Sequence, residues 1–164
     1  MISEKMLSEL NRQINAELYS AYLYLSMSAY FECENLKGFA HWMRVQADEE
    51  TSHALKIYDY VTERLGRVGL LAIEQPPSEW GSPLEAFEEA CKHEVKVTGL
   101  INNLVNIAIA EKDYATQNML QWFVTQQVEE EAQADGIVQK LKLAGTGGPG
   151  LLIMDQGLGQ RKPE

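Results

Sequence analysis

The sequence predicts an all-α protein with a single domain: a bundle of four long helices followed by a short fifth helix. Apolar residues recur at steps of three and four in four long stretches, which is the pattern of amphipathic helices. The first and third breaks between these stretches are short, and the second is long. A chain of 164 residues that is 45% hydrophobic can fill one sizeable core. We expect one domain over residues 1–164, with the bundle at about residues 3–144 and the fifth helix at about residues 149–158.

The first helix is expected from about residue 3 to residue 33. Ser3 is a favourable N-cap, and a short break at residues 34–38 ends the periodic pattern. The stripe that faces the core consists of Leu7, Leu10, Ile14, Leu18, Ala21, Leu25 and Ser28. Because the break is so short, the second helix should pack antiparallel to the first.

The second helix is expected to end near Leu65, because Gly66 supplies a stop signal. Its periodic apolar positions are Phe39, Met43, Ala47, Ala54, Ile57 and Val61.

The segment at residues 66–82 should be a long crossover, because its glycines and prolines prevent a regular helix. Fully extended, it could span about 55 Å, whereas a helix of about 28 residues is about 42 Å long. The second and third helices can therefore be parallel. The segment is also too apolar for a loop in water, so we expect it to pack against another surface, such as a second subunit. Its apolar residues are Leu70, Leu71, Ile73 and Trp80.

The third helix should begin at Pro83, with Ser82 as its cap, and end near Ala110. After another short break, a fourth helix is expected from Lys112 and Asp113 to about Leu143, where the glycine-rich residues 144–148 end it.

The tail contains four consecutive apolar residues at 151–154, enough for about two helical turns. A helix this short is not stable alone, and a contact within an oligomer would explain its apolar character. The alternative is a frayed or locally packed tail.

The charge balance excludes several classes of partner. The chain has 14 Lys and Arg against 24 Asp and Glu, a net charge of -10, which repels nucleic acid and anionic lipid and attracts cations. No apolar run approaches the roughly 20 residues that span a bilayer, and the N-terminus does not resemble a signal peptide. We expect a cytoplasmic protein without nucleic-acid or membrane partners.

Two carboxylates occupy positions where the helical stripes should be apolar. Glu17 follows Ile14 by three residues, and Tyr24 lies one heptad further along the same face. Glu94 is placed in the same way, among Phe87, Ala90, Cys91, Val97 and Ile101. Burying an isolated carboxylate is costly, so each must pair with a cationic side chain or bind a metal.

The other two long helices each carry a polar pair at three-residue spacing. Glu50 and His53 would be neighbours on one helix face, although such a pair taken alone favours a surface hydrogen bond over a pair of metal ligands. Gln127 and Glu130 repeat the spacing, and the alternative there is a solvated acidic run, which we expect to hold for Glu131.

Together, these positions predict a metal site. Di-iron carboxylate bundles have this layout: one carboxylate from each of two helices and a polar pair from each of the other two. Oxygen ligands with few imidazoles favour iron, whereas zinc would require more His or Cys. We expect the metal-free protein to bind divalent metal readily.

Four segments, at residues 15–25, 39–43, 49–54 and 120–131, resemble the prokaryotic non-haem ferritins, and the similarity covers nearly the whole chain. This resemblance implies the ferritin-like fold, with Glu17, Glu50 and His53 on one iron. It also implies that Glu50 bridges to a second iron, bound by Glu94 and Glu130 with Gln127 nearby.

The resemblance also implies what the centre does. Fe(II) would be oxidised by oxygen or hydrogen peroxide, and Fe(III) would be stored as a ferric oxyhydroxide mineral inside a hollow homo-oligomeric shell, a 24-mer. Tyr24 would be an electron donor beside the irons. Trp122 would be either a further redox neighbour or a core residue.

Two departures from related patterns matter. Bacterioferritins have a haem-binding Met at the position of Thr51 and a second Glu-x-x-His where this chain has Gln127 and Glu130, so no haem is expected. A third iron site found in many bacterial ferritins would use Glu49, Glu129 and Glu130, but Gln126 replaces a usual glutamate and should weaken it.

Two other functions fit parts of the pattern. A soluble di-iron oxidase or peroxide reductase would keep the ligands without storing mineral, but it usually has a second redox module. A metal-free structural or signalling bundle would have apolar residues at the four carboxylate positions.

Overall fold

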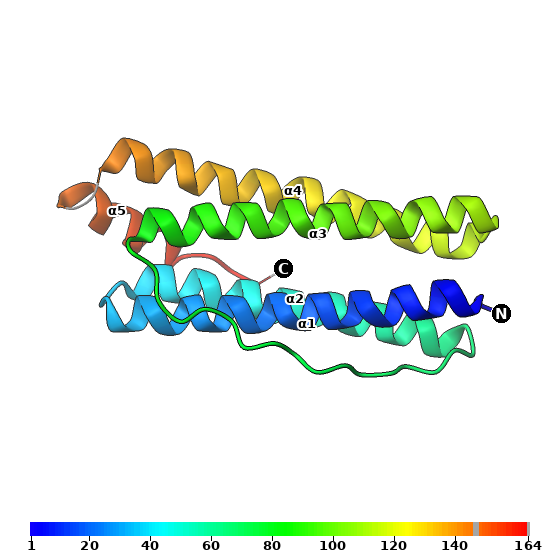
Figure 1. Cartoon of the computed structure of the whole chain (residues 1–164). Helices are drawn as coiled ribbons and strands as arrows, with labels where there is room; N and C mark the ends of the chain where they lie inside the picture. Colours follow the sequence, from blue (N-terminus) through cyan, green and yellow to red (C-terminus); the bar gives the residue numbers. More distant parts are fainter. Residues whose placement is uncertain (146–147, 164) are drawn as a thin grey trace.

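A computed structural model of the chain, which describes residues 1–145 and 148–163, contains five helices and no strand among those residues. The helices are α1 (Glu4–Cys33), α2 (Lys37–Glu63), α3 (Pro83–Glu111), α4 (Tyr114–Ala144) and α5 (Pro149–Leu158) (Figure 1). The predicted four-helix bundle with a short fifth helix is confirmed.

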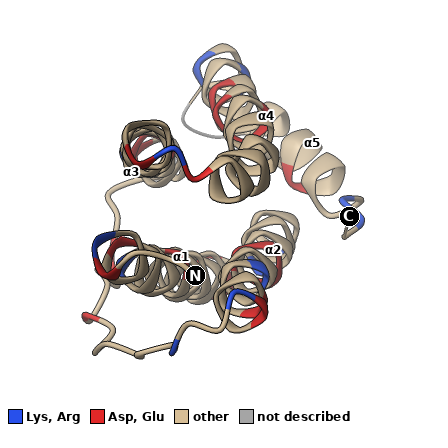
Figure 2. Cartoon of the chain, turned by 90° about the vertical axis from the view of Figure 1, so that its right-hand side faces the viewer, with Lys and Arg blue, Asp and Glu red and all other residues tan. Residues whose placement is uncertain are grey.

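The bundle consists of two antiparallel hairpins, α1 with α2 and α3 with α4, which face each other as two layers (Figure 2). The crossover between α2 and α3 runs along the bundle from one end to the other (Figure 1). The second and third helices are therefore parallel, an arrangement that the length of the crossover allows.

Side-chain caps fix three helix starts. Ser3 accepts a hydrogen bond of 3.0 Å from the Met6 amide, and Ser82 accepts one of 3.1 Å from the Glu85 amide. Asp113 caps α4 in the same way. The predicted end of the second helix was wrong by two residues.

That early end has a local cause two residues after the helix. Leu65 adopts a left-handed conformation (φ 60°), and the Gly66 amide donates a hydrogen bond of 2.9 Å to the Val61 carbonyl. The left-handed residue and this hydrogen bond together end the helix before Gly66.

The apolar core is divided into two clusters, one toward each end of the bundle. One includes Phe31, Phe39 and Phe87, and the other includes Ile57 and Phe123. The four carboxylates predicted to bind metal belong to the stretches between these clusters. A polar layer therefore interrupts the core at mid-height, with apolar packing on both sides that limits access of water.

The crossover is fastened to α1 mainly through polar contacts. Asn15 donates hydrogen bonds to the carbonyls of Leu71 (3.3 Å) and Ala72 (3.1 Å), and the Trp80 ring packs edge-on against Tyr30 with centroids 5.4 Å apart. Leu70, Leu71 and Ile73 remain exposed on the isolated chain. The expected contact of these residues with a second subunit stays a prediction.

The C-terminal segment packs along α2. Asp155 on α5 accepts hydrogen bonds from the amides of Gly38 (2.8 Å) and Phe39 (3.0 Å), so it caps the start of α2 from a distant part of the chain. Further along, Arg161 forms an ion pair of 2.6 Å with Glu49 and stacks over Trp42. Local packing of the tail, one of the two alternatives considered, therefore occurs. Residues 146 and 147 of the predicted glycine-rich break lie outside the described residues.

Crossing a membrane requires a long, apolar helix, and none of the helices in the described parts of the chain meets that requirement.

Candidate metal centre

The polar layer brings together one or more side chains from each long helix. Glu17 comes from α1, Glu50 and His53 from α2, Glu94 from α3 and Glu130 from α4, and none is more than 6% exposed. Each helix buries its polar residue because that residue falls within the apolar stripe, which must face the partner helices. The described residues form two groups with atoms close enough to hold a metal ion.

The first group is Glu17, Glu50 and His53, whose ligand atoms all lie within 4.8 Å of one another. His53 Nδ1 is 3.3 Å from Glu50 Oε2 and 3.9 Å from Glu17 Oε2. Gln13 donates a hydrogen bond of 2.7 Å to Glu17 Oε1, but Glu17 Oε2 has no hydrogen-bond partner among the described residues. A buried carboxylate oxygen without a donor, close to an imidazole nitrogen, is suited to a cation.

The second group is Glu50, Glu94 and Glu130, again within 4.8 Å. Tyr24 donates a hydrogen bond to Glu94 Oε1, and Gln127 Nε2 lies 3.2 Å from Glu94 Oε2. Glu50 belongs to both groups, so two metal ions held here would share this carboxylate.

Gln46 is a member of the site that the sequence analysis missed. Its side-chain nitrogen Nε2 donates to Glu50 Oε1 (2.8 Å) and to Glu130 Oε2 (2.7 Å), while its Oε1 has no partner among the described residues. One signal could have found it: Gln46 precedes Glu50 by four residues, just as Gln13 precedes Glu17. An amide one turn before a buried carboxylate lies on the same helix face and can donate to it.

The electrostatics of the layer favour neutral carboxyl groups when no cation is present. Burial, followed by the nearby Glu50 charge, raises the pKa of Glu17 to about 8. Burial and then Glu94 raise the pKa of Glu130 to about 7. Burial raises the pKa of Glu50 well above its ordinary value and also raises that of Glu94. At neutral pH a divalent cation that binds Glu17 therefore displaces its proton.

Aromatic rings flank the first group. The Trp122 ring meets the His53 ring edge-on with centroids 5.3 Å apart, and Phe123 contacts the same imidazole at 6.0 Å. Trp122 is 37% exposed, so of the two roles considered for it, the simple core role is wrong.

The residues expected at a third iron site are not gathered in the same way. Glu49 forms the ion pair with Arg161, and Glu129 is exposed. No metal-sized group in the described part of the chain combines either residue with Glu130. Their role as ligands stays a prediction.

The expectation that Glu131 is simply solvated was wrong. It is half-buried and accepts a hydrogen bond from the Thr98 hydroxyl of α3. The reason is the packing of α3 against α4, which places Glu131 on the wall of a groove between these helices.

Comparisons with known proteins identify the family and the fold of this chain. A family model described as a ferritin-like domain matches residues 7–144. A bacterial non-heme ferritin from Bacteroides fragilis is 52% identical over 161 residues, which covers 98% of this chain and 100% of that relative. A bacterial non-heme ferritin from Campylobacter jejuni is 43% identical over 156 residues, covering 95% and 93%. Among solved structures, an open pore ferritin from the hyperthermophilic archaeon Archaeoglobus fulgidus has a TM-score of 0.98 at 59% identity, covering 99% of this chain and 100% of that one.

Proposed function

Because the chain belongs to the ferritin-like family, we propose that its buried centre oxidises Fe(II) and that the protein stores the product as a ferric mineral within an oligomeric shell. Iron storage is supported by the names of the relatives, bacterial non-heme ferritins, at up to 52% identity. The observation that carries the site assignment is the pair of three-residue groups that share Glu50.

Iron is the substrate of this centre. Glu17 and His53 hold the first Fe(II), Glu94 and Glu130 hold the second, and Glu50 contacts both. Fe(II) accepts carboxylate and imidazole ligands, and a shared carboxylate holds two irons close enough to react with one oxidant molecule. Haem has no part in the proposal.

The surrounding residues control protons and water. The carboxyl groups lose their protons as the cations bind, because the positive charge offsets the cost of burying carboxylates. Tyr24 donates a hydrogen bond to Glu94, so it can give an electron to the oxidant, oxygen or hydrogen peroxide, while its proton passes to Glu94. The apolar clusters on both sides of the layer limit the access of water.

The shell would be a 24-mer in the cytoplasm, like the shells that the family resemblance implies. The exposed apolar residues of the crossover support assembly, because an isolated soluble chain rarely leaves such residues in water.

The first experiment adds an excess of Fe(II) in air to the purified protein and separates the products by size exclusion, with iron and protein measured in each fraction. Far more iron than about two ions per chain, on a large particle, would support storage. Iron that stops near about two ions per chain, on a small oligomer, would overturn storage and favour a di-iron oxidase or peroxide reductase.

A matched pair of variants connects the result to the centre. Glu50→Ala with His53→Ala should abolish rapid oxidation, whereas Thr51→Ala with Ser52→Ala, two exposed positions between them, should leave it unchanged. Unchanged oxidation in the first variant would contradict the proposed site.

A further inference from the structure

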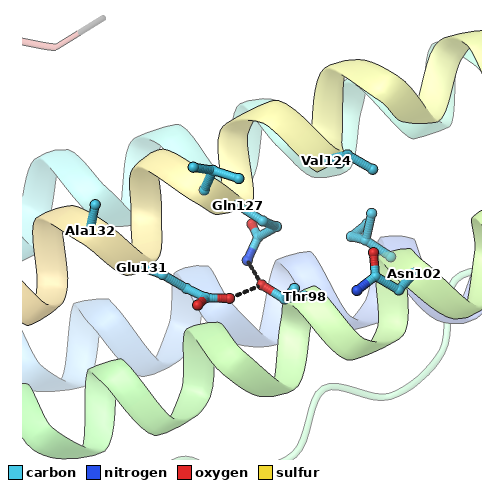
Figure 3. Close-up of a pocket in the computed structure, with 8 residues that line it drawn as sticks. Thr98, Asn102, Val124, Gln127, Glu131 and Ala132 are labelled. Atoms are coloured by element: carbon cyan, nitrogen blue, oxygen red, sulfur yellow. Dashed lines mark hydrogen bonds between the residues drawn. The ribbon is translucent and has the colours of Figure 1, made fainter.

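A groove of about 580 Å³ lies between α3 and α4, on the side of the centre occupied by the second metal group. Figure 3 shows Gln127 and Glu131 on α4 reaching toward Thr98 on α3. The groove is lined by Thr98, Ile101, Asn102, Val124, Gln127, Val128, Glu131 and Ala132.

A continuous chain of hydrogen bonds joins this groove to the buried carboxylates. The Thr98 hydroxyl donates to Glu131, and Gln127 Nε2 lies 3.2 Å from Thr98 Oγ1 (Figure 3). The same nitrogen lies 3.2 Å from Glu94 Oε2 and 3.3 Å from the Glu94 carbonyl oxygen. The groove therefore ends at Gln127, whose side chain contacts Glu94, a member of the second group.

The helical register explains the alignment. Thr98 follows Glu94 by four residues on α3, and Glu131 follows Gln127 by four on α4. Each outer residue therefore lies about 6 Å, one turn, from its buried partner and on the same helix face.

The charge of the groove suits a cation. Of the described residues that line it, Glu131 alone is charged, and no lysine or arginine in the described part of the chain lies within ion-pair distance of it. Gln127, only 4% exposed, separates Glu131 from the centre. Its three hydrogen bonds are all 3.2–3.3 Å long, at the weak end of the usual range.

We infer that the α3–α4 groove is the last part of the route by which a hydrated divalent cation reaches the centre, with Glu131 as the capturing residue and Gln127 as the gate. The inference rests on the proposed function. Glu131 binds the cation at the surface, and the Gln127 amide then moves away from Glu94 Oε2, which becomes available as a ligand. Thr98 holds the gate in its closed position through the hydrogen bond with Gln127.

A second pocket of about 250 Å³, between α1 and α3, is less suited to this role. It is lined by Lys96 as well as Glu74, and its inner residue is His93, which lies 2.7 Å from Ser20 Oγ. None of the five carboxylate and histidine residues of the centre lines either cavity, but only the α3–α4 groove has a lining side chain, Gln127, that is hydrogen-bonded to one of them. A cation there would meet a positive side chain, Lys96, and no side chain hydrogen-bonded to a ligand of the centre.

The two routes can be tested by introducing a tryptophan at either of two positions on α3. Asn102→Trp would fill the α3–α4 groove, and Leu100→Trp would fill the α1–α3 pocket; both positions are exposed. The probe is Co(II) under anaerobic conditions, followed by its absorption in stopped flow, with the number bound per chain measured at equilibrium. We expect Asn102→Trp to slow the binding of Co(II) to the centre by about tenfold or more, with the number of ions bound at equilibrium unchanged. Leu100→Trp should bind Co(II) at the wild-type rate.

The charge at the mouth gives a second readout. Glu131→Gln should slow Co(II) binding several-fold at low ionic strength. This difference from the wild-type rate should disappear at about 1 M salt, where charges are screened within about 3 Å. Light scattering on each variant verifies that the assembly is intact.

The outcomes separate the route from the function. Wild-type filling rates in Asn102→Trp, or slowing by Leu100→Trp instead, would overturn the route while two Co(II) per chain at equilibrium still supported the centre. If wild-type protein bound no Co(II) at equilibrium, the proposed function itself would fail.

Discussion

The side-chain amide of Gln46, on α2, donates a hydrogen bond of 2.7 Å to Glu130 on α4 and thereby joins the two hairpins at the level of the metal centre. The same nitrogen donates to Glu50 over 2.8 Å. Two carboxylates from different helices are thus held together before any cation arrives, and this is the arrangement that the second metal position needs.

Replacing Gln46 by Leu should weaken the second metal position more than the first. Burial raises the pKa of Glu50 and of Glu130, and the Gln46 hydrogen bond partly offsets that rise, so its loss makes both carboxyl groups harder to deprotonate. We expect Co(II) affinity at the second position to fall by about tenfold at pH 7, with a smaller effect at pH 8.5. Calorimetric titration at the two pH values measures this, and Gln121→Leu, at an exposed position of α4, is the control.

The pH dependence of metal-free stability should report Glu17. Its carboxyl holds a proton up to about pH 8 when folded but only up to about 4.5 when unfolded. The stability associated with this group is therefore fully present below about pH 4.5 and is lost as the pH rises to about 8. Above that pH, Glu17→Gln should be more stable than wild type by at most about 5 kcal/mol, with the difference vanishing near pH 4.5.

Guanidinium unfolding in the presence of a chelator measures that difference. With saturating Co(II), wild type should instead be more stable than Glu17→Gln, because the Glu17 carboxylate then has a cation to pair with. If the difference in free energy of unfolding between Glu17→Gln and wild type were the same at pH 8.5 as at pH 5, the assignment of the raised pKa to Glu17 would be wrong.

Two ligand variants should differ in stoichiometry because of the shared carboxylate. His53 belongs to one group and Glu50 to both, so His53→Ala should retain the second cation while Glu50→Ala weakens both positions by more than about tenfold. Equilibrium dialysis with Co(II) counts the ions. Loss of both cations in His53→Ala would show that the two positions are not separable in this way.

Tyr24→Phe should separate metal binding from oxidation. Tyr24 supplies no atom to either ligand group but donates a hydrogen bond to Glu94. We expect the variant to bind two Co(II) per chain and to oxidise Fe(II) roughly tenfold more slowly. Tyr22→Phe, an exposed tyrosine of the same helix, should behave as wild type, and equal rates in all three proteins would exclude the electron-donor role.

Gly38→Ala should release α5 from the bundle. A Cβ at this position would lie 1.6 Å from the Asp155 backbone oxygen, so the two segments cannot keep their contact, and the Asp155 cap on α2 is lost. The cost should be at least about 2 kcal/mol, seen as a lower unfolding midpoint and faster proteolysis of the tail. Gly99→Ala is the matched control, because a Cβ there meets nothing within 4 Å and a helical alanine is slightly favourable.

Much of the fold and part of the site could be predicted because they depend on local rules. Ser3, Ser82 and Asp113 mark helix starts through their own side chains, and the three- and four-residue periodicity of each stretch defines the face that is buried. Glu17 and Glu94 were expected to be buried because they interrupt that periodicity, and both are. The length of the crossover showed that the second and third helices could be parallel, and they are (Figure 1).

The parts that could not be predicted depend on contacts between helices. Gln46 gains its role only when α4 brings Glu130 within 2.7 Å, and Glu131 becomes a groove residue only because Thr98 of α3 faces it. Arg161 reaches Glu49 across 112 positions of sequence. Periodicity specifies which face of a helix is buried, but it does not specify which residues of another helix stand opposite. Packing decides that, and with it which carboxylate oxygens are paired, which are free to accept a cation, and where the centre opens to solvent.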